Sequence, residues 1–401
     1  MAQKYYHSGL SGAPVLNGAA GSLIAVIDAV NDGWGMATAT SLVVSGGIAT
    51  ATFASPHAAD VDITVRVAGA TPSGLNGDWM LTAKGGSTIS WPTAVADGAA
   101  TGTITVKIAP LGLQKAFTGT NKAVYKSTAP AATGFCLRVD DTATTSARVV
   151  GYESMTDVDT GTNAFPTAAQ VTGGMFWNKS ATAGSTAIPW EILGDERGFY
   201  FMKAVRVPTS NTYVGRDCNW FGDITSFKST DGYACVLVGS TALADDTGGN
   251  VGWLASPSQG ATTPSYVARS LTQIGTSARG YRTATVAASA AATSSVFSGG
   301  TVDACFGTYP AAADLSARTT PIMFAENPGV TATDTQLRGL FPGAYSSLLR
   351  IPGGTFSARD TIDATGDMAG KKLLVCPGYS APAVPSSTPG AFFLDIKGAW
   401  R

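Results

Sequence analysis

Charged side chains, histidine and paired cysteines are scarce in this chain. Only 13% of its 401 residues are charged, and 26 Lys and Arg against 27 Asp and Glu leave a net charge of −1. This balance, together with the lack of a basic run, argues against a nucleic-acid partner. The two histidines and five widely spaced cysteines include no CxxC pair, so no zinc site and no cofactor are expected. An odd number of unpaired cysteines also indicates folding in a reducing compartment.

Long apolar runs are missing as well. The longest, residues 23–30, is interrupted by Asp28 and is far shorter than the roughly 20 residues that a membrane helix needs. The N-terminus lacks the basic start and apolar centre of a signal peptide. The sequence therefore predicts a soluble protein that is made in a cytoplasm and has no membrane partner.

What the chain has in quantity is turn-forming and small residues. It contains 48 Gly and 20 Pro, while 44% of its residues are hydrophobic, which is ample for a folded core. We expect a mostly β, multidomain fold of antiparallel β-sandwich or barrel modules with a short N-terminal helix. The expected divisions are an N-terminal arm and helix (1–36), a small β module (37–112), a central β domain (113–244) and a C-terminal β-rich region with small-residue-rich loops (245–401).

The N-terminal arm combines a Gly/Ser loop with the best helix candidate of the chain. Residues 23–30 place their apolar side chains on one face and leave Asp28 outside; Ser22 is the expected N-cap, and Asn31-Asp32-Gly33 the stop. An apolar arm must be covered, either by its own domain or by a neighbouring subunit. Taking the second alternative as an assembly hypothesis, we assign the contact to Tyr5, Tyr6, Leu10, Leu23, Ile24 and Ile27.

Alternating apolar and polar residues predict strands in the rest of the chain. The pattern is clear at residues 61–67 and 103–108, and the pair Asn76-Gly77 between them predicts a tight turn. Phe135, Leu137 and Val139 alternate in the same way. Residues 372–376 read as a buried strand, and the apolar end of the chain is expected to be held in a sheet.

A loop with alternating acidic residues, 157–163, is the most tempting candidate for a metal site. Its Asp and Asn oxygens could converge on a hard cation. An EF-hand loop starting at Asp157 would, however, require Glu where Ala168 stands, and Gly161 occupies a ligand position. An Asx-type turn is the favoured interpretation.

Acidic residues also occur in groups, at 140/141, 191/195/196 and 217/223. A glycosidase needs two carboxylates that converge across a cleft, but acids beside arginines more commonly form ion pairs. No Gly-x-Ser-x-Gly elbow or phosphate loop is present, and His7 and His57 do not lie beside a nucleophile motif. We therefore expect a protein that is not an enzyme.

Three stretches are more particular than the composition around them. They are residues 5–14 (YYHSGLSGAP), residues 138–141 with 151–155 (RVDD and GYESM), and residues 337–343 (LRGLFPG) with Asp395-Ile396 and Trp400-Arg401. In these places the chain resembles virion structural proteins encoded among the tail and assembly genes of tailed bacteriophages. The resemblance spans most of the chain, and it implies a multi-copy, β-rich component of a particle, with no catalytic residues to transfer.

The resulting functional hypothesis is a structural subunit of the tail, the tail tip or the baseplate. Its expected partners are other virion proteins and copies of itself, and its expected location is the virion. Within the same class, the alternative is a capsid decoration protein. From other classes, the alternatives are a host receptor- or glycan-binding tail protein that stacks sugars on Trp177, Trp190 and Trp220, and a cell-wall-degrading enzyme that acts through Glu191 and Asp195.

Overall fold

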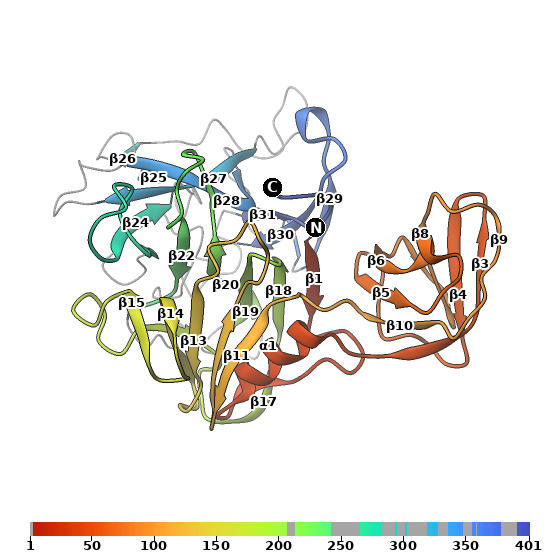
Figure 1. Ribbon diagram of the computed structural model, residues 1–401, viewed down its shortest axis with the longest axis horizontal. Helices are drawn as coiled ribbons and strands as arrows, with labels where there is room; N and C mark the ends of the chain where they lie inside the picture. Colours follow the sequence, from red (N-terminus) through yellow and green to blue (C-terminus); the bar gives the residue numbers. More distant parts are fainter. Residues whose placement is uncertain are drawn as a thin grey trace.

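A computed structural model of the chain describes residues 3–206, 213–241, 265–282, 293–294, 301–302, 319–327, 336–347, 355–357, 359–377 and 391–401. The mostly β prediction is confirmed, because the described residues form antiparallel sheets and a single α-helix (Figure 1). Among the described residues, no helix is long and apolar enough to cross a membrane.

The largest sheet joins the two ends of the chain. Its strand order is β1-β18-β19-β20-β22-β23-β24-β27-β28-β31-β30-β29, and β21 pairs with β28. The strands are β1 (Lys4–His7), β18 (Trp190–Asp195), β19 (Gly198–Arg206), β20 (Tyr213–Asp223), β21 (Thr225–Ser226), β22 (Cys235–Val238), β23 (Ser265–Val267), β24 (Ala278–Arg282), β27 (Thr319–Asn327), β28 (Gln336–Ser347), β29 (Thr361–Asp363), β30 (Lys372–Pro377) and β31 (Ala391–Asp395). The buried strand expected at residues 372–376 and the pinned chain end are both confirmed, as β30 and β31.

A second sheet is built from consecutive strands of the central region. Its order is β11-β12-β13-β14-β15, with β16 paired to β14. Its strands are β11 (Gln114–Gly119), β12 (Lys122–Lys126), β13 (Cys136–Asp140), β14 (Ser146–Met155), β15 (Gly161–Phe165) and β16 (Met175–Asn178). Leu137 and Val139 of β13 are fully buried, as their alternation predicts.

Residues 37–108, called the small module below, form a third set of strands that projects to one side of the molecule (Figure 1). The strand order is β6-β5-β10-β3-β4-β8-β7, with β9 paired to β3. The strands are β3 (Ala37–Ser45), β4 (Ile48–Phe53), β5 (Thr64–Ala68), β6 (Gly77–Met80), β7 (Ala83–Lys84), β8 (Thr88–Pro92), β9 (Gly98–Ala99) and β10 (Thr105–Ile108). The rest of the described chain is called the body.

The prediction of a tight turn at Asn76-Gly77 is wrong. A 3₁₀ helix, η1 (Ser73–Leu75), precedes Asn76, whose backbone is extended. The Asn76 side-chain amide instead donates to the carbonyl of Ala70 and accepts from its N–H, both at 2.8 Å. The side chain thus closes the connection between β5 and β6, which is longer than a two-residue turn.

The helix α1 (Ser22–Asp32) buries the apolar face that its periodicity predicts. Its N-terminus differs from the prediction. The N-cap residue is Gly21 and not Ser22, so the N-cap has no side chain that could bond the first N–H groups of the helix. The carboxylate of Asp141 takes this role: its Oδ2 accepts from the backbone N–H groups of Leu23 and Ile24 at 2.8 and 3.2 Å. An acceptor more than a hundred residues away therefore satisfies the free N–H groups of the helix.

The small module is inserted between α1 and β11, and its two connections run together. Gly33 ends the helix with φ 69°, and a Cβ at this position would lie 2.1 Å from the carbonyl oxygen of Ile108. The N–H of Ile108 donates to Trp34 O at 2.9 Å, and the N–H of Leu111 donates to Val30 O at 3.0 Å. Only glycine fits this crossing, which brings the end of β10 against the end of α1.

The sheets do not follow the expected domain divisions throughout. The small module begins at residue 37 and its last strand ends at Ile108, close to the expected 37–112. The largest sheet continues past residue 244, where a boundary was expected, because β22 pairs with β23, with Val236 opposite Val267. The arm is not separate either, since β1 pairs with β18. One cluster of buried side chains runs through the arm, the small module and both sheets of the body.

Two short pairs complete the described strands. β2 (Leu16–Gly18) pairs with β17 (Gly184–Ile188), and β25 (Thr293–Ser294) pairs with β26 (Thr301–Val302). A further 3₁₀ helix, η3 (Gly366–Met368), lies between β29 and β30.

Candidate functional site

The six side chains assigned to an assembly contact are covered by the chain itself. Their exposed fractions range from 0 to 9%, for Tyr5, Tyr6, Leu10, Leu23, Ile24 and Ile27. The hydroxyl of Tyr6, for example, donates to Ala109 O at 2.7 Å, and burial raises its pKa well above the usual value. The arm therefore follows the first alternative, docking on its own chain, and these side chains offer no surface to a neighbour in this structure.

The three tryptophans of the glycan-platform alternative are also fully buried. The ring of Trp177 packs between Phe199 and Phe201, at centroid distances of 5.8 and 5.6 Å. The indole N–H of Trp190 donates to Pro14 O at 2.9 Å, and that of Trp220 donates to Gly222 O at 3.1 Å. Sugar stacking needs an open ring face, so these tryptophans act as core residues.

The acidic loop 157–163 forms the expected Asx-type turn. Asp157 Oδ1 accepts from the N–H groups of Asp159 and Thr160, both at 2.8 Å. Asp159 forms ion pairs with Lys122 and Arg138 at 2.8 and 2.6 Å. Among the described residues, no group of three or more His, Cys, Asp or Glu side chains could hold a metal ion.

Carboxylates of all three acidic groups contact basic side chains, and in the third group Asp223 contacts Arg197 at 3.0 Å. Asp141 is fully buried and paired with the fully buried Lys179, whereas its neighbour Asp140 contacts Arg138 at 3.2 Å. Burial raises the pKa of Asp141. The pair proposed for cell-wall degradation is also engaged: Glu191 contacts Arg359 at 3.3 Å, and Asp195 contacts Arg401 at 3.3 Å.

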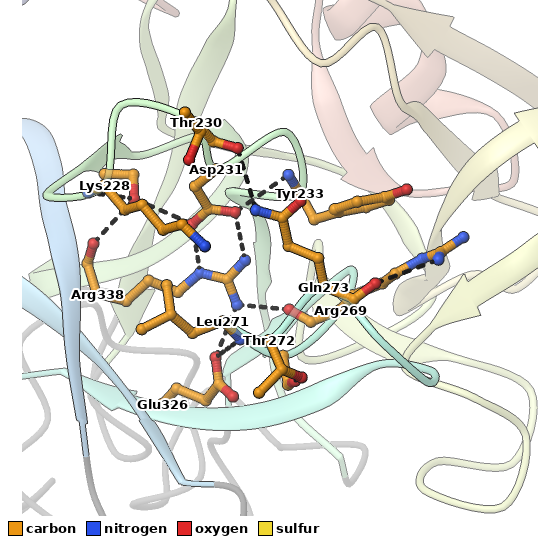
Figure 2. A network of polar contacts seen from close by, with 12 residues as sticks. Lys228, Thr230, Asp231, Tyr233, Arg269, Leu271, Thr272, Gln273, Glu326 and Arg338 are labelled. Carbon is orange, nitrogen blue, oxygen red and sulfur yellow. Dashed lines mark hydrogen bonds and ion pairs between the residues drawn. The ribbon is translucent and has the colours of Figure 1, made fainter.

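A buried polar network surrounds Arg338 of β28 (Figure 2). The guanidinium of Arg338 donates to both carboxylate oxygens of Asp231, at 2.8 and 2.9 Å, and to Glu326 Oε2 at 2.7 Å. Burial opposes ionisation of Asp231, but the bonds from Arg338 outweigh it and lower its pKa.

The neighbouring Arg269 extends this network to the second sheet. Its guanidinium pairs with Glu153 of β14 at 2.5 and 2.7 Å and lies 4.3 Å from the ring centroid of Tyr233. The backbone carbonyl of Arg269 accepts from Arg338. Because every acid of this network is held by a guanidinium, its role is structural.

An open pocket, called the Trp79 pocket below, lies where the small module meets the body. Its volume is about 680 Å³, within the roughly 300–1,000 Å³ typical of small-ligand sites. Strands β1, β5, β6 and β8 line it, together with a residue between β6 and β7 and the segment after β31. The lining residues are Lys4, Thr64, Arg66, Gly77, Asp78, Trp79, Met80, Thr82, Pro92, Lys397 and Gly398.

The position of these side chains follows from strand alternation. Val65 and Val67 of β5 point into the core of the small module, so Arg66 between them points outward, opposite Asp78 of β6. Arg66 donates to the two carboxylate oxygens of Asp78 at 2.6 and 2.8 Å. Lys4 of the body reaches Asp78 Oδ2 at 2.7 Å.

The electrostatics of the Trp79 pocket favour an anion. Three cations, Lys4, Arg66 and Lys397, line it together with one carboxylate, so the lining carries 3 − 1 = +2 charges. The hydrogen bonds from Arg66 and Lys4 keep the pKa of Asp78 below its usual value, although burial acts to raise it. Burial lowers the pKa of Lys4, against the opposing effect of Asp78.

Lys397 differs from the other two cations. Its backbone N–H donates to the buried Asp395 carboxylate at 3.0 Å, which fixes the segment, while the side chain is exposed. Within the described part of the chain, no hydrogen bond or ion pair involves its ammonium group. Lys397 is thus the cation most open to a ligand.

Trp79 is held firmly but is not covered. Its ring is half-buried and packs against the fully buried Trp91 at a centroid distance of 6.5 Å and an interplanar angle of 25°. Its indole N–H donates to Leu75 O at 2.9 Å. Because the N–H is used inside the module, the ring offers the pocket a fixed apolar surface.

This arrangement suits binding rather than catalysis. Among the described residues, the lining contains one carboxylate, whose low pKa and ion pairs disfavour a role as proton donor, whereas glycoside cleavage uses two. The sequence alone did not indicate this site, because in this region it predicted only a tight turn at Asn76-Gly77. The available signal was the alternation that places Arg66 outside the module.

No protein-family model matches this chain, and no curated protein matches its sequence.

Proposed function

We propose that this chain is a multi-copy structural subunit of a tailed-bacteriophage particle, placed in the tail, the tail tip or the baseplate. The observation that carries the proposal is the outer face of the small module. Strands β3 and β9 lie at the end of the module farthest from the body (Figure 1), and residues 33–59, which include β3 and β4, contain no Asp, Glu, Lys or Arg.

The outward residues of β3 and β4 are small, β-branched or hydroxylated. Val43 is 41% exposed and Ile48 is 40% exposed, and they are surrounded by Ser41, Ser45, Thr50 and Thr52. Protein–protein interfaces are depleted of charge at their centre, so an uncharged, projecting face suits contact with a like subunit or another virion protein. Neither strand carries a charged side chain, and the carboxylate at the edge of the face, Asp97, accepts from the N–H of Gly46 in the β3–β4 turn at 3.0 Å.

The contact is therefore assigned to this face rather than to the N-terminal arm. Deleting residues 1–35 would not test assembly cleanly, because it would remove β1 from its sheet and the buried face of α1 from the core. Surface substitutions on β3 and β4 avoid this problem.

The test is incorporation of variants into particles, measured as copies per particle by quantitative mass spectrometry. The double variant Val43→Lys/Ile48→Lys should reduce incorporation about ten-fold or more, because two desolvated lysines oppose association. The matched control, Val43→Thr/Ile48→Thr, keeps β-branched uncharged side chains and should incorporate normally. Equal incorporation of both variants would remove this face from the assembly contact.

Absence of the protein from purified wild-type particles would contradict the proposal as a whole. Fractionation of disrupted particles separates the remaining alternatives within the class. Recovery with tails supports the tail assignment, and recovery with the capsid shell supports a decoration protein.

A further inference from the structure

We infer that the Trp79 pocket binds a saccharide that carries a carboxylate, such as a uronic or sialic acid unit. The inference does not depend on the assembly proposal, since it concerns a different surface of the small module. It rests on three features that meet in one hollow: a fixed aromatic ring, an excess of positive charge and neutral hydroxyl groups.

The aromatic feature indicates a ligand with a flat apolar face. The ring of Trp79 is anchored by Trp91 and by the bond from its N–H to Leu75, so it is preorganised. Met80 and Pro92 extend the apolar lining. The C–H face of a sugar ring matches such a surface, and a preorganised aromatic side chain loses little entropy on binding.

The charge selects an acidic ligand over a neutral one. Asp78 neutralises one of the three cations, and Glu196 acts electrostatically on Lys4 from outside the lining. Even with Glu196 included, the balance is 3 − 2 = +1. Lys4 and Arg66 are already engaged with Asp78, whereas the ammonium of Lys397 is open to pair with a ligand carboxylate.

Polar groups beside the ring complete the match. Thr64 and Thr82 belong to the lining. The Thr82 hydroxyl donates to Ser90 O at 3.4 Å and can still accept from a sugar hydroxyl, and the Thr64 hydroxyl can donate or accept. A purely aliphatic anion would leave them unused. The pocket volume of about 680 Å³ accommodates a short oligosaccharide.

The position of the pocket adds a consequence for the fold. Lys4 belongs to β1 of the body, whereas Arg66 and Asp78 belong to the small module, and Lys4 and Asp78 join across the junction at 2.7 Å. A ligand in the pocket therefore contacts both parts, so that binding also reinforces the junction between them.

The experiment uses isothermal titration calorimetry on the purified full chain at low salt. The probes are 3′-sialyllactose against lactose, and tri-galacturonate against maltotriose, so that each acidic sugar has a neutral counterpart. We expect at least one acidic sugar to bind about ten-fold or more tightly than its counterpart, which corresponds to about 1.4 kcal/mol. A polyglutamate peptide is included to measure binding by charge alone.

Two lysine variants locate the site. Lys397→Glu should weaken the acidic sugar about ten-fold or more, because it replaces attraction by repulsion at the pocket. Lys228→Glu makes the same change of net charge at another exposed lysine, which lines a separate polar hollow beside Arg197 and Asp231, and should have less than a two-fold effect. Trp79→Phe, which keeps an aromatic ring, should weaken binding of the acidic sugar less than Lys397→Glu does.

Several results would overturn the inference. These are absence of binding by both acidic sugars, equal affinity for acidic and neutral sugars, equal effects of the two lysine variants, or polyglutamate binding as tight as that of the sugars. The last would define an anion site without saccharide selectivity. Incorporation of Lys397→Glu into particles is measured as well. Normal incorporation would show that failure of the saccharide inference leaves the assembly proposal intact.

Discussion

Two arginine–aspartate pairs with the same two-bond geometry occur in different surroundings in this molecule. In the body, Arg338 and Asp231 have side chains that are 0% exposed, and Glu326 is a further acceptor. In the small module, the side chains of Arg66 and Asp78 are 42% and 21% exposed. The donor–acceptor distances are similar, at 2.6 to 2.9 Å.

The difference shows that bonding geometry alone does not tell what an ion pair does. Removing one partner of a buried pair leaves a charge without water, while an exposed partner recovers its hydration. The Arg338 pair is therefore suited to holding sheets together. The Arg66 pair remains accessible and shapes the charge of a pocket.

Breaking the buried pair gives the largest expected effect. Arg338→Met should lower the free energy of unfolding by about 3–5 kcal/mol, because Asp231 and Glu326 stay buried without their cation. Urea unfolding followed by tryptophan fluorescence measures the change. Arg338→Lys, which keeps a positive charge but cannot form both bonds to Asp231, is the control and should lose less free energy of unfolding. A loss below about 1 kcal/mol in Arg338→Met would mean that this buried pair contributes no more than a surface pair.

His7, whose side chain is partly exposed, tests how burial affects a charged group, through the dependence of stability on pH. Burial and the charge of Arg359 lower the pKa of His7 to about 4, while Glu191 and Asp60 act in the opposite direction. Between pH 6.5 and 4 the unfolded chain binds a proton that the folded chain does not, so stability falls as the pH is lowered through this window. This one group contributes a slope of at most about 1.4 kcal/mol per pH unit.

The variant His7→Asn should remove that contribution. Asparagine can replace the ring Nδ1 that accepts from Gly9 N–H at 3.1 Å, but it does not titrate. Unfolding free energies measured from pH 7 to 4.5 should fall less steeply in the variant than in the wild type. Parallel curves would show that His7 is not the group responsible.

Breaking the exposed pair gives the smallest expected change in stability. Arg66→Met should alter the free energy of unfolding by no more than about 1 kcal/mol, because Asp78 retains Lys4 and is partly hydrated. The same urea experiment measures it. A loss as large as that of Arg338→Met would mean that exposure does not separate the two pairs.

The positions of the tryptophans illustrate what could be predicted about the site. Trp177, Trp190 and Trp220 were the candidates for stacking on sugars, yet all three are fully buried in the folded chain. Trp79 follows the predicted Asn76-Gly77 turn and was not a candidate, but it borders the pocket because β6 lies against the body there, where Asp78 meets Lys4. Exposure of a side chain depends on which elements cover it, and sequence neighbours do not reveal this.

The sequence by itself determined the local structure of this protein. Abundant glycine and small residues, the alternation in β5, β10 and β13 and the apolar run of β30 produced a mostly β fold. The apolar periodicity of residues 23–30 produced α1. These features depend on neighbours along the chain. Only the tertiary structure decided the long-range contacts. Asp141 caps α1, β1 lies in the sheet that contains β18, and Lys4 meets Asp78 at the junction, because each of these joins segments whose proximity exists only in the folded chain.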